Sequence, residues 1–504
     1  MEQFDYIVVG AGSAGCVLAS RLTEDPATRV LLIEAGPRDT HLWIHVPLGY
    51  GKLFARTDIN WAYESEPEPA LNGRKVFTPR GKVLGGSSSI NGLVYIRGQR
   101  EDYDGWGIRG WGFEDLLPYF RKSEIKVSEL PRHELCDAFI EASAALGVPR
   151  TADFNGPSQE GTGYYRATTS GRRRSSAATA YLRPAEKRPN LSVEVDSLVT
   201  RILFEGKRAV GVQCKDRVFK AREVLLCAGA FNSPQLLQLS GVGPRALLER
   251  HGIPVVHDSP RVGEGLQDHF YARTFWRCRR KITLNDDMAT WWRQALMGMD
   301  YLFRGKGHMM VAGGYAAAFI RTRPELKRPD AQIYLINFSS AQRGGILHSH
   351  SGFTCSVSQT QVESRGSVQI RSPLPTDPPA IRYNYLATEN DRRVMVEGLK
   401  FVRRVCATAP MRDYVEAEFL PGDKVKSDDD WLDYCREYGE TVFHPTSTCS
   451  IGSVVDDKLR VNGVANLRVV DASVMPAVPS GNINASVIAV AEKAADLIRG
   501  GAGQ

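Results

Sequence analysis

The chain has 504 residues, of which 42% are hydrophobic and 24% charged, a balance that excludes a largely disordered protein. Its 64 basic and 57 acidic residues leave a formal net charge of +7, too small for this length to indicate a nucleic-acid partner. The length allows about three ordinary domains or two large ones. The densest basic run, at residues 172–174, is interpreted as a solvated loop, with an anion or partner contact as the alternative.

Cysteine usage and hydropathy indicate the compartment. The nine cysteines are scattered and no two form C-x-x-C, which favours reduced thiols over a disulfide framework or a zinc site, so we expect no metal. No apolar run is long enough to cross a bilayer, and the N-terminus lacks the pattern of a signal peptide. We therefore expect a soluble cytoplasmic protein, and peripheral contact with a membrane stays open.

The first 34 residues have the pattern of a βαβ unit. Residues 6–9 (YIVV) and 30–33 (VLLI) are short apolar runs typical of buried parallel strands. Between them lie a glycine-rich turn at 10–15 (GAGSAG) and a small, apolar stretch at 16–22 that predicts a helix.

The rest of the chain alternates between two styles. Residues 36–80 predict a long surface excursion, and a second glycine-rich segment follows at 81–91. Strand-like runs over 191–228 predict a meander that returns to the opening sheet, followed by a turn and a helix at 233–240 with Pro234 near its start. Further helices are predicted at 113–122, 135–146, 291–303, 391–407 and 485–499, and further strands at 332–338, 353–361, 366–370 and 467–471.

These elements predict an α/β protein with two interleaved architectures. A split, doubly wound Rossmann-type domain that binds a dinucleotide alternates with an α+β domain built on an antiparallel sheet. We assign residues 1–125, 190–269 and 444–504 to the first domain, and residues 126–189 and 270–443 to the second.

The first glycine-rich turn fits a dinucleotide-binding motif because of its context. Gly10, Gly12 and Gly15 open a predicted helix after a strand, and Glu34 ends the next strand 24 residues after Gly10. The glycines let the backbone approach a pyrophosphate, and Glu34 can accept from ribose hydroxyls while its charge disfavours NADP. A tight turn without a ligand is the alternative. The motif alone does not separate NAD from FAD, but the sequence has no second copy, so the substrate must exchange electrons directly with one dinucleotide.

Further segments join this motif: EAGP at 34–37, RGKVLGGSSSIN at 80–91, GAFNSPQLLQLSGVG at 229–243, HPTSTC at 444–449, VVDAS at 469–473 and GNIN at 481–484. Together they resemble the glucose–methanol–choline (GMC) oxidoreductases over nearly the whole chain, and they are most similar to the bacterial alcohol, sorbose and choline dehydrogenase branch. The resemblance implies bound FAD and the oxidation of a primary or secondary alcohol to the carbonyl, with hydride transfer to flavin N5.

The resemblance also implies roles for individual residues. It puts the catalytic histidine at His444 and the second catalytic position at Asn482, with Asn484 as the less favoured choice. A neutral imidazole can take the proton of an alcohol near pH 7, and an amide can donate to the developing alkoxide. The alternatives are a structural histidine and an asparagine that caps a helix. The implied cofactor-binding residues are Gly10, Gly12, Ser13, Ala14, Gly15, Glu34, Ala35, Arg80, Gly85, Gly86, Ser89, Asn91, Gly92, Val94, Val199, Ala228, Gly229, Asp471, Ala472, Asn482, Ile483 and Asn484.

Three features depart from the family pattern. Ile90 stands where covalent flavin attachments use a histidine, which implies non-covalent FAD. Tyr315 stands where choline-oxidising members carry a glutamate, four residues before a phenylalanine like Phe319. Choline therefore loses its counter-ion, although Tyr315 could offer a cation–π contact. The segment between Glu124 and Leu130 is shorter than usual in the family, which implies a more open entrance.

The residues expected to line the substrate end of the cavity are Tyr315, Gln359 and Phe443. Residues 353–362 match a strand that lines the family's substrate cavity, and their polarity suggests that Gln359 or Gln361 recognises a polar substrate. The solvent face of an alternating strand is an equal alternative. The tryptophans Trp276, Trp291 and Trp292 are expected to pack, with a place in the cavity as the alternative.

The implied partners are a small-molecule alcohol and an electron acceptor, either a quinone or O2. The leading interpretation is an FAD-dependent dehydrogenase that passes electrons to a quinone or another acceptor. An alcohol oxidase that reduces O2 to H2O2 shares every motif. Two further classes stay open: a non-redox lyase or photoenzyme on the same scaffold, and a nicotinamide dehydrogenase.

Overall fold

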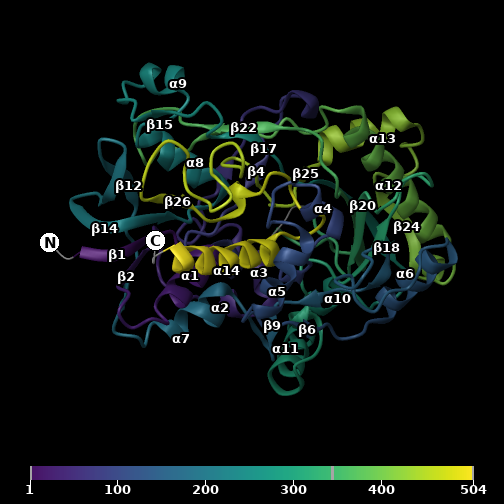
Figure 1. Cartoon of the computed structure of the whole chain (residues 1–504). Helices are drawn as coiled ribbons and strands as arrows, with labels where there is room; N and C mark the ends of the chain where they lie inside the picture. Colours follow the sequence, from purple (N-terminus) through teal and green to yellow (C-terminus); the bar gives the residue numbers. More distant parts are fainter. Residues whose placement is uncertain (1–2, 342–344, 502–504) are drawn as a thin grey trace.

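The computed structural model describes residues 3–341 and 345–501 (Figure 1). In this part of the chain most strands belong to two large sheets, one mostly parallel and one antiparallel. Each sheet has its own cluster of buried hydrophobic side chains. The predicted α/β fold with a second, antiparallel sheet is therefore confirmed.

The first sheet combines segments that are far apart in the sequence. Its order is β11–β2–β1–β14–β13–β12, and β26 pairs with β14. The strands β11, β2, β1, β14 and β26 run parallel, whereas β12, β13 and β14 form the predicted antiparallel meander. Their bounds are β1 (Gln3–Val9), β2 (Val30–Ile33), β11 (Leu191–Glu194), β12 (Val199–Glu205), β13 (Arg208–Cys214), β14 (Arg217–Leu226) and β26 (Leu467–Val469). The structure differs from the prediction at β11, which is not part of the meander. This strand pairs in parallel with β2, whose residues are all buried, and so covers the edge of β2.

Two helices from opposite ends of the chain pack together on this sheet. Helix α1 (Ser13–Leu22) contacts α14 (Asn484–Gly501), and α5 (Phe113–Lys122) packs on α14 (Figure 1). The start of α1 lies so close to the preceding turn that a Cβ on Gly15 would be 1.9 Å from the carbonyl oxygen of Gly10. Gly15 is therefore needed for packing of the turn against the helix.

The second sheet is antiparallel throughout. Its order is β24–β18–β21–β20–β19–β7, and β25 pairs with β18. The bounds are β7 (Gly161–Tyr164), β18 (Phe270–Cys278), β19 (Ala316–Ile320), β20 (Ala331–Ile336), β21 (Gly352–Gln359), β24 (Val415–Leu420) and β25 (Glu440–Thr441). The helices α6 (Glu134–Ala145), α12 (Glu389–Ala407) and α13 (Asp428–Tyr438) pack on it. Every residue of the central strand β21 is buried, so this strand is shielded from solvent on both faces of the sheet.

Helix α8 (Gly229–Leu239) begins earlier than the predicted start at residue 233 and contains Pro234 in its interior. Pro234 has no N–H to donate to the carbonyl of Ala230, four residues before it. The hydroxyl of Thr448 donates to this carbonyl instead, at 2.7 Å. A partner from a distant segment therefore lets the helix continue through the proline.

The remaining elements are short. The helices are α2 (Leu42–His45), α3 (Tyr50–Leu53), α4 (Arg100–Asp104), α7 (Arg183–Ala185), α9 (Arg245–Arg250), α10 (Leu284–Met288) and α11 (Trp291–Met299). The strands are β3 (Tyr63–Glu64), β4 (Phe77–Thr78), β5 (Val94–Tyr95), β6 (Ser128–Glu129), β8 (Arg166–Ala167), β9 (Thr169–Ser170), β10 (Arg173–Arg174), β15 (Val242–Gly243), β16 (His257–Asp258), β17 (Glu264–Leu266), β22 (Gly366–Gln369) and β23 (Ala380–Arg382). Among the described residues, no helix combines the length and the hydropathy that a membrane span requires.

A buried ion pair joins α1 to α14. The side chain of Glu492 is fully buried, and its two oxygens accept from Arg21 Nε at 2.9 Å and Nη2 at 2.8 Å. The hydroxyl of Tyr181 donates to the same carboxylate at 2.8 Å. Burial removes water from this pair, so each charged group depends on the other.

We predict that Glu492→Ala lowers the free energy of unfolding by about 3 kcal/mol, because it leaves the nearly buried Arg21 guanidinium without its main partner. Urea titration of the apoprotein measures the change. Glu24→Ala is the matched control, since Glu24 pairs with the same arginine but its side chain is 38% exposed. It should cost less than about 1 kcal/mol. Equal losses in the two variants would contradict the role of Glu492.

Candidate active site

A cavity of about 720 Å³ extends from the first glycine-rich turn to the antiparallel sheet. At one end it is lined by residues of β1, α1 and β2, and at the other by residues of β18, β20 and β21. His444 and Asn482 line the same cavity. The predicted cofactor motif and the predicted catalytic residues therefore border one cavity.

The glycine end has the features of an anion-binding cradle. Gly10 has φ +98°, and a Cβ there would lie 2.7 Å from the carbonyl oxygen of Cys227. Helix α1 begins after Gly12 with no side-chain cap, so the N–H groups of its first turn are not occupied by a capping side chain. Such a helix start attracts phosphate through its N–H donors and its dipole.

The second glycine-rich segment lies directly on the first. The N–H of Gly85 donates to the carbonyl of Ala11 at 2.7 Å, and a Cβ on Gly86 would lie 2.7 Å from the Cα of Gly12. Contact this close requires glycine at position 86.

Glu34 lines the cavity at the end of β2 and is 5% exposed. Its carboxylate accepts from the N–H of Ala11 at 2.8 Å and from the N–H of Gly36 at 3.0 Å. Burial raises its pKa to about 7, although these donors act in the opposite direction. Its position fits an acceptor for ribose hydroxyls.

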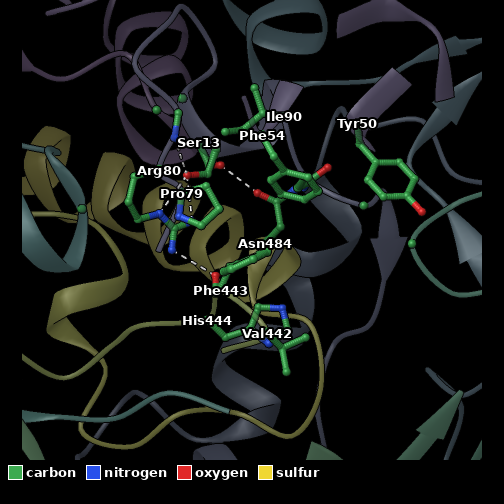
Figure 2. A pocket seen from close by; sticks show the side chains of 18 of the residues that line it. Ser13, Tyr50, Phe54, Pro79, Arg80, Ile90, Val442, Phe443, His444 and Asn484 are labelled. Atoms are coloured by element: carbon green, nitrogen blue, oxygen red, sulfur yellow. Dashed lines mark hydrogen bonds between the residues drawn. The ribbon is translucent and has the colours of Figure 1, made fainter. Parts of the chain in front are cut away.

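Two polar contacts fix the helices around this end. The hydroxyl of Ser13 donates to Asn484 Oδ1 at 2.7 Å, so the starts of α1 and α14 are joined (Figure 2). Asp471 accepts from the N–H of Gly229 at 2.9 Å and from the hydroxyl of Ser233 at 2.5 Å. Asp471 therefore holds the start of α8.

His444 follows a strained residue. Phe443 has φ +69°, which is unusual for a side chain of this size. Its carbonyl accepts from Arg80 Nη1 at 3.0 Å, and Arg80 Nη2 donates to the hydroxyl of Ser87 at 2.8 Å (Figure 2). Loss of solvation around the Arg80 guanidinium lowers its pKa. The strained backbone beside His444 is thus tied to the second glycine-rich segment.

His444 is 8% exposed, and its imidazole has a partner on each nitrogen. Nδ1 lies 3.0 Å from Nδ1 of His269, and Nε2 lies 3.2 Å from Nδ2 of Asn482. Gln332 donates to Oδ1 of Asn482 at 3.4 Å, which leaves the Asn482 N–H groups for His444. The neutral tautomer of His444 that fits this network accepts at Nε2 and carries its proton on Nδ1.

Buried groups surround this histidine. Asp268 accepts from the backbone N–H of His444 at 2.6 Å and from the hydroxyls of Tyr385 and Thr441, and burial raises its pKa to about 6. Burial lowers the pKa of His269 to about 4, so His269 is neutral near pH 7. A neutral His269 with its proton on Nε2 can accept from Nδ1 of His444.

One face of the antiparallel sheet forms the other wall. Cross-strand rows place Arg273, Ser356 and Tyr334 side by side, with Tyr271 and Gln332 in the next row. All five residues line the cavity. The wall is therefore polar, and Arg273 gives it a positive charge.

Most predicted site residues line the cavity, namely Gly10, Gly12, Ser13, Ala14, Glu34, Ala35, Arg80, Gly86, Asn91, Gly92, Val94, Val199, Ala228, Gly229, Phe443, His444, Asp471, Ala472, Asn482, Ile483 and Asn484. Gly15, Gly85 and Ser89 are not in its lining. Gly85 has φ +87°, and the buried hydroxyl of Ser89 donates to the carbonyl of Leu84 at 2.7 Å. These three residues support the backbone of the two glycine-rich segments without lining the cavity.

The structure does not place Tyr315 and Gln359 in the cavity. The hydroxyl of Tyr315 donates to the carbonyl of Pro131 at 2.5 Å, and its ring packs against Tyr164. Gln359 pairs with Ala331 on the opposite face of β21 from Thr354 and Ser356, because side chains alternate along a strand. That face packs on α12.

The remaining polar and aromatic candidates also lie elsewhere. Gln361 donates to the carbonyl of Pro329 at 3.0 Å, and the alternative of a solvent-facing strand fails because β21 is buried throughout. Trp276 is buried and stacks on Phe353, whereas Trp291 and Trp292 are exposed. Neither of the two outcomes expected for Trp291 and Trp292, core packing or a place in the cavity, is observed.

Sequence reasoning missed Asp268, His269, Arg273 and Gln332. The adjacent acid and histidine before a strand were a usable signal for the first two. Arg273 and Gln332 occupy alternating strand positions, and only the pairing of β18, β21 and β20 brings them to one wall. Among the described residues no group of His, Cys, Asp and Glu could hold a metal ion, and all nine cysteines are unpaired and buried.

Known proteins resemble this chain over its full length. The sequence signature of GMC oxidoreductases matches residues 4–271, and that of their C-terminal part matches residues 362–491. The oxygen-dependent choline dehydrogenase of Pseudomonas putida is 42% identical, over 99% of this chain and 94% of that protein. Pyridoxine 4-oxidase from Mesorbium loti superposes with a TM-score of 0.89 at 30% identity, covering 99% of both chains. A formate oxidase variant from Aspergillus oryzae RIB40 reaches 0.93 at 26% identity, covering 99% and 98%.

The two matched regions include the first sheet, both glycine-rich segments, His444 and Asn482, whereas residues 272–361, with most of the antiparallel sheet, lie between them. The glycine cradle, the buried Glu34 and the uncapped start of α1 fit the dinucleotide part of FAD. The chain therefore belongs to the GMC oxidoreductases, a family of flavoproteins that bind FAD.

Proposed function

We propose that this protein oxidises a primary or secondary alcohol to the carbonyl. The observation that supports this most directly is the pairing of His444 Nε2 with Asn482 Nδ2, at 3.2 Å, in the cavity that both glycine-rich segments border. FAD, when bound, supplies the acceptor for the hydride equivalent that leaves the carbinol carbon. The remaining tasks belong to side chains of this chain.

In this proposal His444 is the general base. Its Nε2 lone pair takes the hydroxyl proton of the alcohol, and an unprotonated imidazole can do so near pH 7. Asn482 Nδ2 donates to the alkoxide oxygen as negative charge develops on it. A hydroxyl oxygen that lies beside this pair, within hydrogen-bond distance of both Nε2 and Nδ2, would contact both groups, so one position serves both steps.

His269 has a positioning role in this proposal. Its Nδ1 accepts the proton of His444 Nδ1 across 3.0 Å, which keeps the lone pair of His444 on Nε2. Asp268 accepts from the backbone N–H of His444. The tautomer and the position of His444 thus come from two adjacent residues of one segment.

Non-covalent binding of FAD is supported by Ile90, which lines the cavity and carries no nucleophilic atom. Residues that would hold the dinucleotide are the backbone of Gly10, Gly12 and Ser13 and the carboxylate of Glu34.

The electron acceptor in our proposal is a quinone or another organic acceptor. An alcohol oxidase that reduces O2 is the second candidate, because the relatives are named oxygen-dependent choline dehydrogenase, pyridoxine 4-oxidase and formate oxidase. The rate at which air reoxidises the reduced protein separates the two.

Choline does not fit the charge of the cavity, although the Pseudomonas relative is named for it. The lining includes Arg273, and its carboxylates Glu34 and Asp471 belong to the glycine end. Glu440 pairs with Arg273 at 3.4 Å but is not part of the lining. A quaternary ammonium would therefore approach a cation without a facing carboxylate.

We predict that Gly12→Ala weakens FAD binding at least about tenfold without destabilising the apoprotein. A Cβ at Gly12 meets only the carbonyl oxygen of Cys227, at 3.9 Å, but it enters the cavity. Flavin fluorescence quenching gives the affinity after acid release of FAD. Gly15→Ala is the contrasting variant, since it clashes with Gly10 and should lower stability instead. Unchanged affinity of Gly12→Ala would contradict the placement of the dinucleotide.

We predict that His444→Ala retains the flavin absorbance but slows anaerobic flavin reduction by an alcohol at least about a hundredfold, the low end of general-base contributions. Stopped-flow bleaching with aliphatic, aryl and sugar alcohols provides the rates. His251→Ala, at the end of α9 and outside the cavity lining, should bleach at the wild-type rate. Normal bleaching by His444→Ala would remove it from the mechanism.

We predict that 3,3-dimethyl-1-butanol, the uncharged isostere of choline, reduces the flavin at least about tenfold faster than choline at equal concentration, because only choline carries a charge that Arg273 opposes. In Arg273→Gln this ratio should fall toward one. A faster reaction with choline in the wild-type protein would show that the charge argument is wrong.

A further inference from the structure

Large exposed apolar side chains gather on helix α11 and on the π-helical turn after it, Asp300–Arg304. Trp291 is 81% exposed and Phe303 is 80% exposed. The further exposed large apolar side chains of this segment are Trp292, Leu296, Met299 and Leu302. We call these six residues the apolar face.

The apolar face has helical order but no partner within the described part of the chain. Residues 292, 296 and 299 repeat at intervals of four and three, which places them on one stripe of α11, and Leu302 and Phe303 follow in the π-helical turn. No residue of α11 is buried, so this stripe is not part of a core. Six exposed large apolar side chains in one short segment indicate an interaction site rather than ordinary surface.

The segment is firmly attached to the body of the protein. Tyr301 is buried with Val46 and Met310, and its hydroxyl donates to the carbonyl of Arg172 at 2.8 Å. In return Arg172 Nη1 donates to the carbonyl of Tyr301 at 3.4 Å. The apolar face is therefore a fixed part of the fold.

The segment that carries the apolar face has more basic than acidic side chains. Residues 291–310 contain Arg293, Arg304 and Lys306 but a single acidic residue, Asp300, which pairs with Arg304 at 3.0 Å. The guanidinium of Arg293 lies over the ring of Trp292. Through the Tyr301 contact the exposed run of residues 172–173 adjoins the same segment. Trp, Phe and Leu beside Arg and Lys form the composition of helices that lie in a membrane interface.

This helix also borders the active-site cavity. Gln294 and Met297 of α11 line the cavity, together with Met288 before the helix and Met309 after it. In Figure 1 α11 lies at the edge of the molecule, next to α10. One helix thus presents residues both to the cavity and to the outside.

We propose that the apolar face docks on a bilayer that contains anionic phospholipids. The aromatic and aliphatic side chains enter the interfacial region, and the arginines and lysine of the same segment contact phosphate groups. A second copy of the chain fits less well, because a two-fold contact through this face would bring its basic residues against themselves. Docking would hold the cavity beside the lipid, so that a lipid-soluble quinone reaches it from the bilayer; this last consequence rests on the proposed function.

The test is co-sedimentation of the FAD-loaded protein with phosphatidylcholine vesicles that do or do not contain phosphatidylglycerol. We expect binding to the anionic vesicles, with a blue shift of tryptophan emission from Trp291 and Trp292. The double variant Trp291→Ser, Phe303→Ser should bind at least about tenfold more weakly. The double variant Arg293→Gln, Lys306→Gln should lose about fivefold per residue and should be less sensitive to salt.

Leu374→Ser is the matched control, because Leu374 is 57% exposed in the loop between β22 and β23. It should bind vesicles like the wild type. All variants should retain FAD and the wild-type rate of flavin reduction, so a failure of docking is distinguishable from a failure of the proposed function. The inference is overturned by absent binding to anionic vesicles, by equal binding to neutral vesicles, or by a dimer in solution that the Trp291→Ser, Phe303→Ser variant dissociates.

Discussion

Direct backbone contact between the two glycine-rich segments determines where the rest of the cavity lies. Gly86 rests on Gly12 at a distance that leaves no room for a Cβ, and the N–H of Gly85 closes the contact through the carbonyl of Ala11. Arg80 precedes the second segment and reaches the carbonyl of Phe443. A side chain between the segments would shift Arg80, and with it the backbone that carries His444. Segments from opposite ends of the chain are thus held in one geometry by a contact that only glycine permits.

Around His444 hydrogen bonds to buried polar groups fix the geometry of the site. A buried carboxylate is costly unless several donors satisfy it, and Asp268 has three, one of which is the backbone N–H of His444 itself. The neighbouring His269 accepts from the imidazole. The backbone and the ring are therefore fixed by two adjacent residues, so a displacement of this segment would disturb both at once. The strained φ of Phe443 persists because these contacts determine its surroundings.

The sequence predicts best what depends on local pattern. The βαβ opening, the meander, helices α5 and α12 and the residues around the cavity follow from periodicity, glycine spacing and the family resemblance. The other features depend on which distant segments of the chain pack together. Pro234 lies inside α8 because Thr448, a distant residue, satisfies Ala230. Side chains alternate along β21, and Gln359 lies on the face that α12 covers rather than on the cavity face. The sequence of β21 alone could not show which of its two faces α12 covers.

The same limit applies to α11, and it changes how that helix is interpreted. A periodic apolar stripe shows that a face is to be covered, but it does not show what covers it. In α12 and α13 the stripe meets the antiparallel sheet or a neighbouring helix, and the large apolar side chains are buried. The stripe of α11 has equally large side chains and a comparable period, yet none is buried. Because the described part of the chain does not cover this stripe, and its segment carries more basic than acidic side chains, the anionic bilayer proposed above is the surface that would cover it.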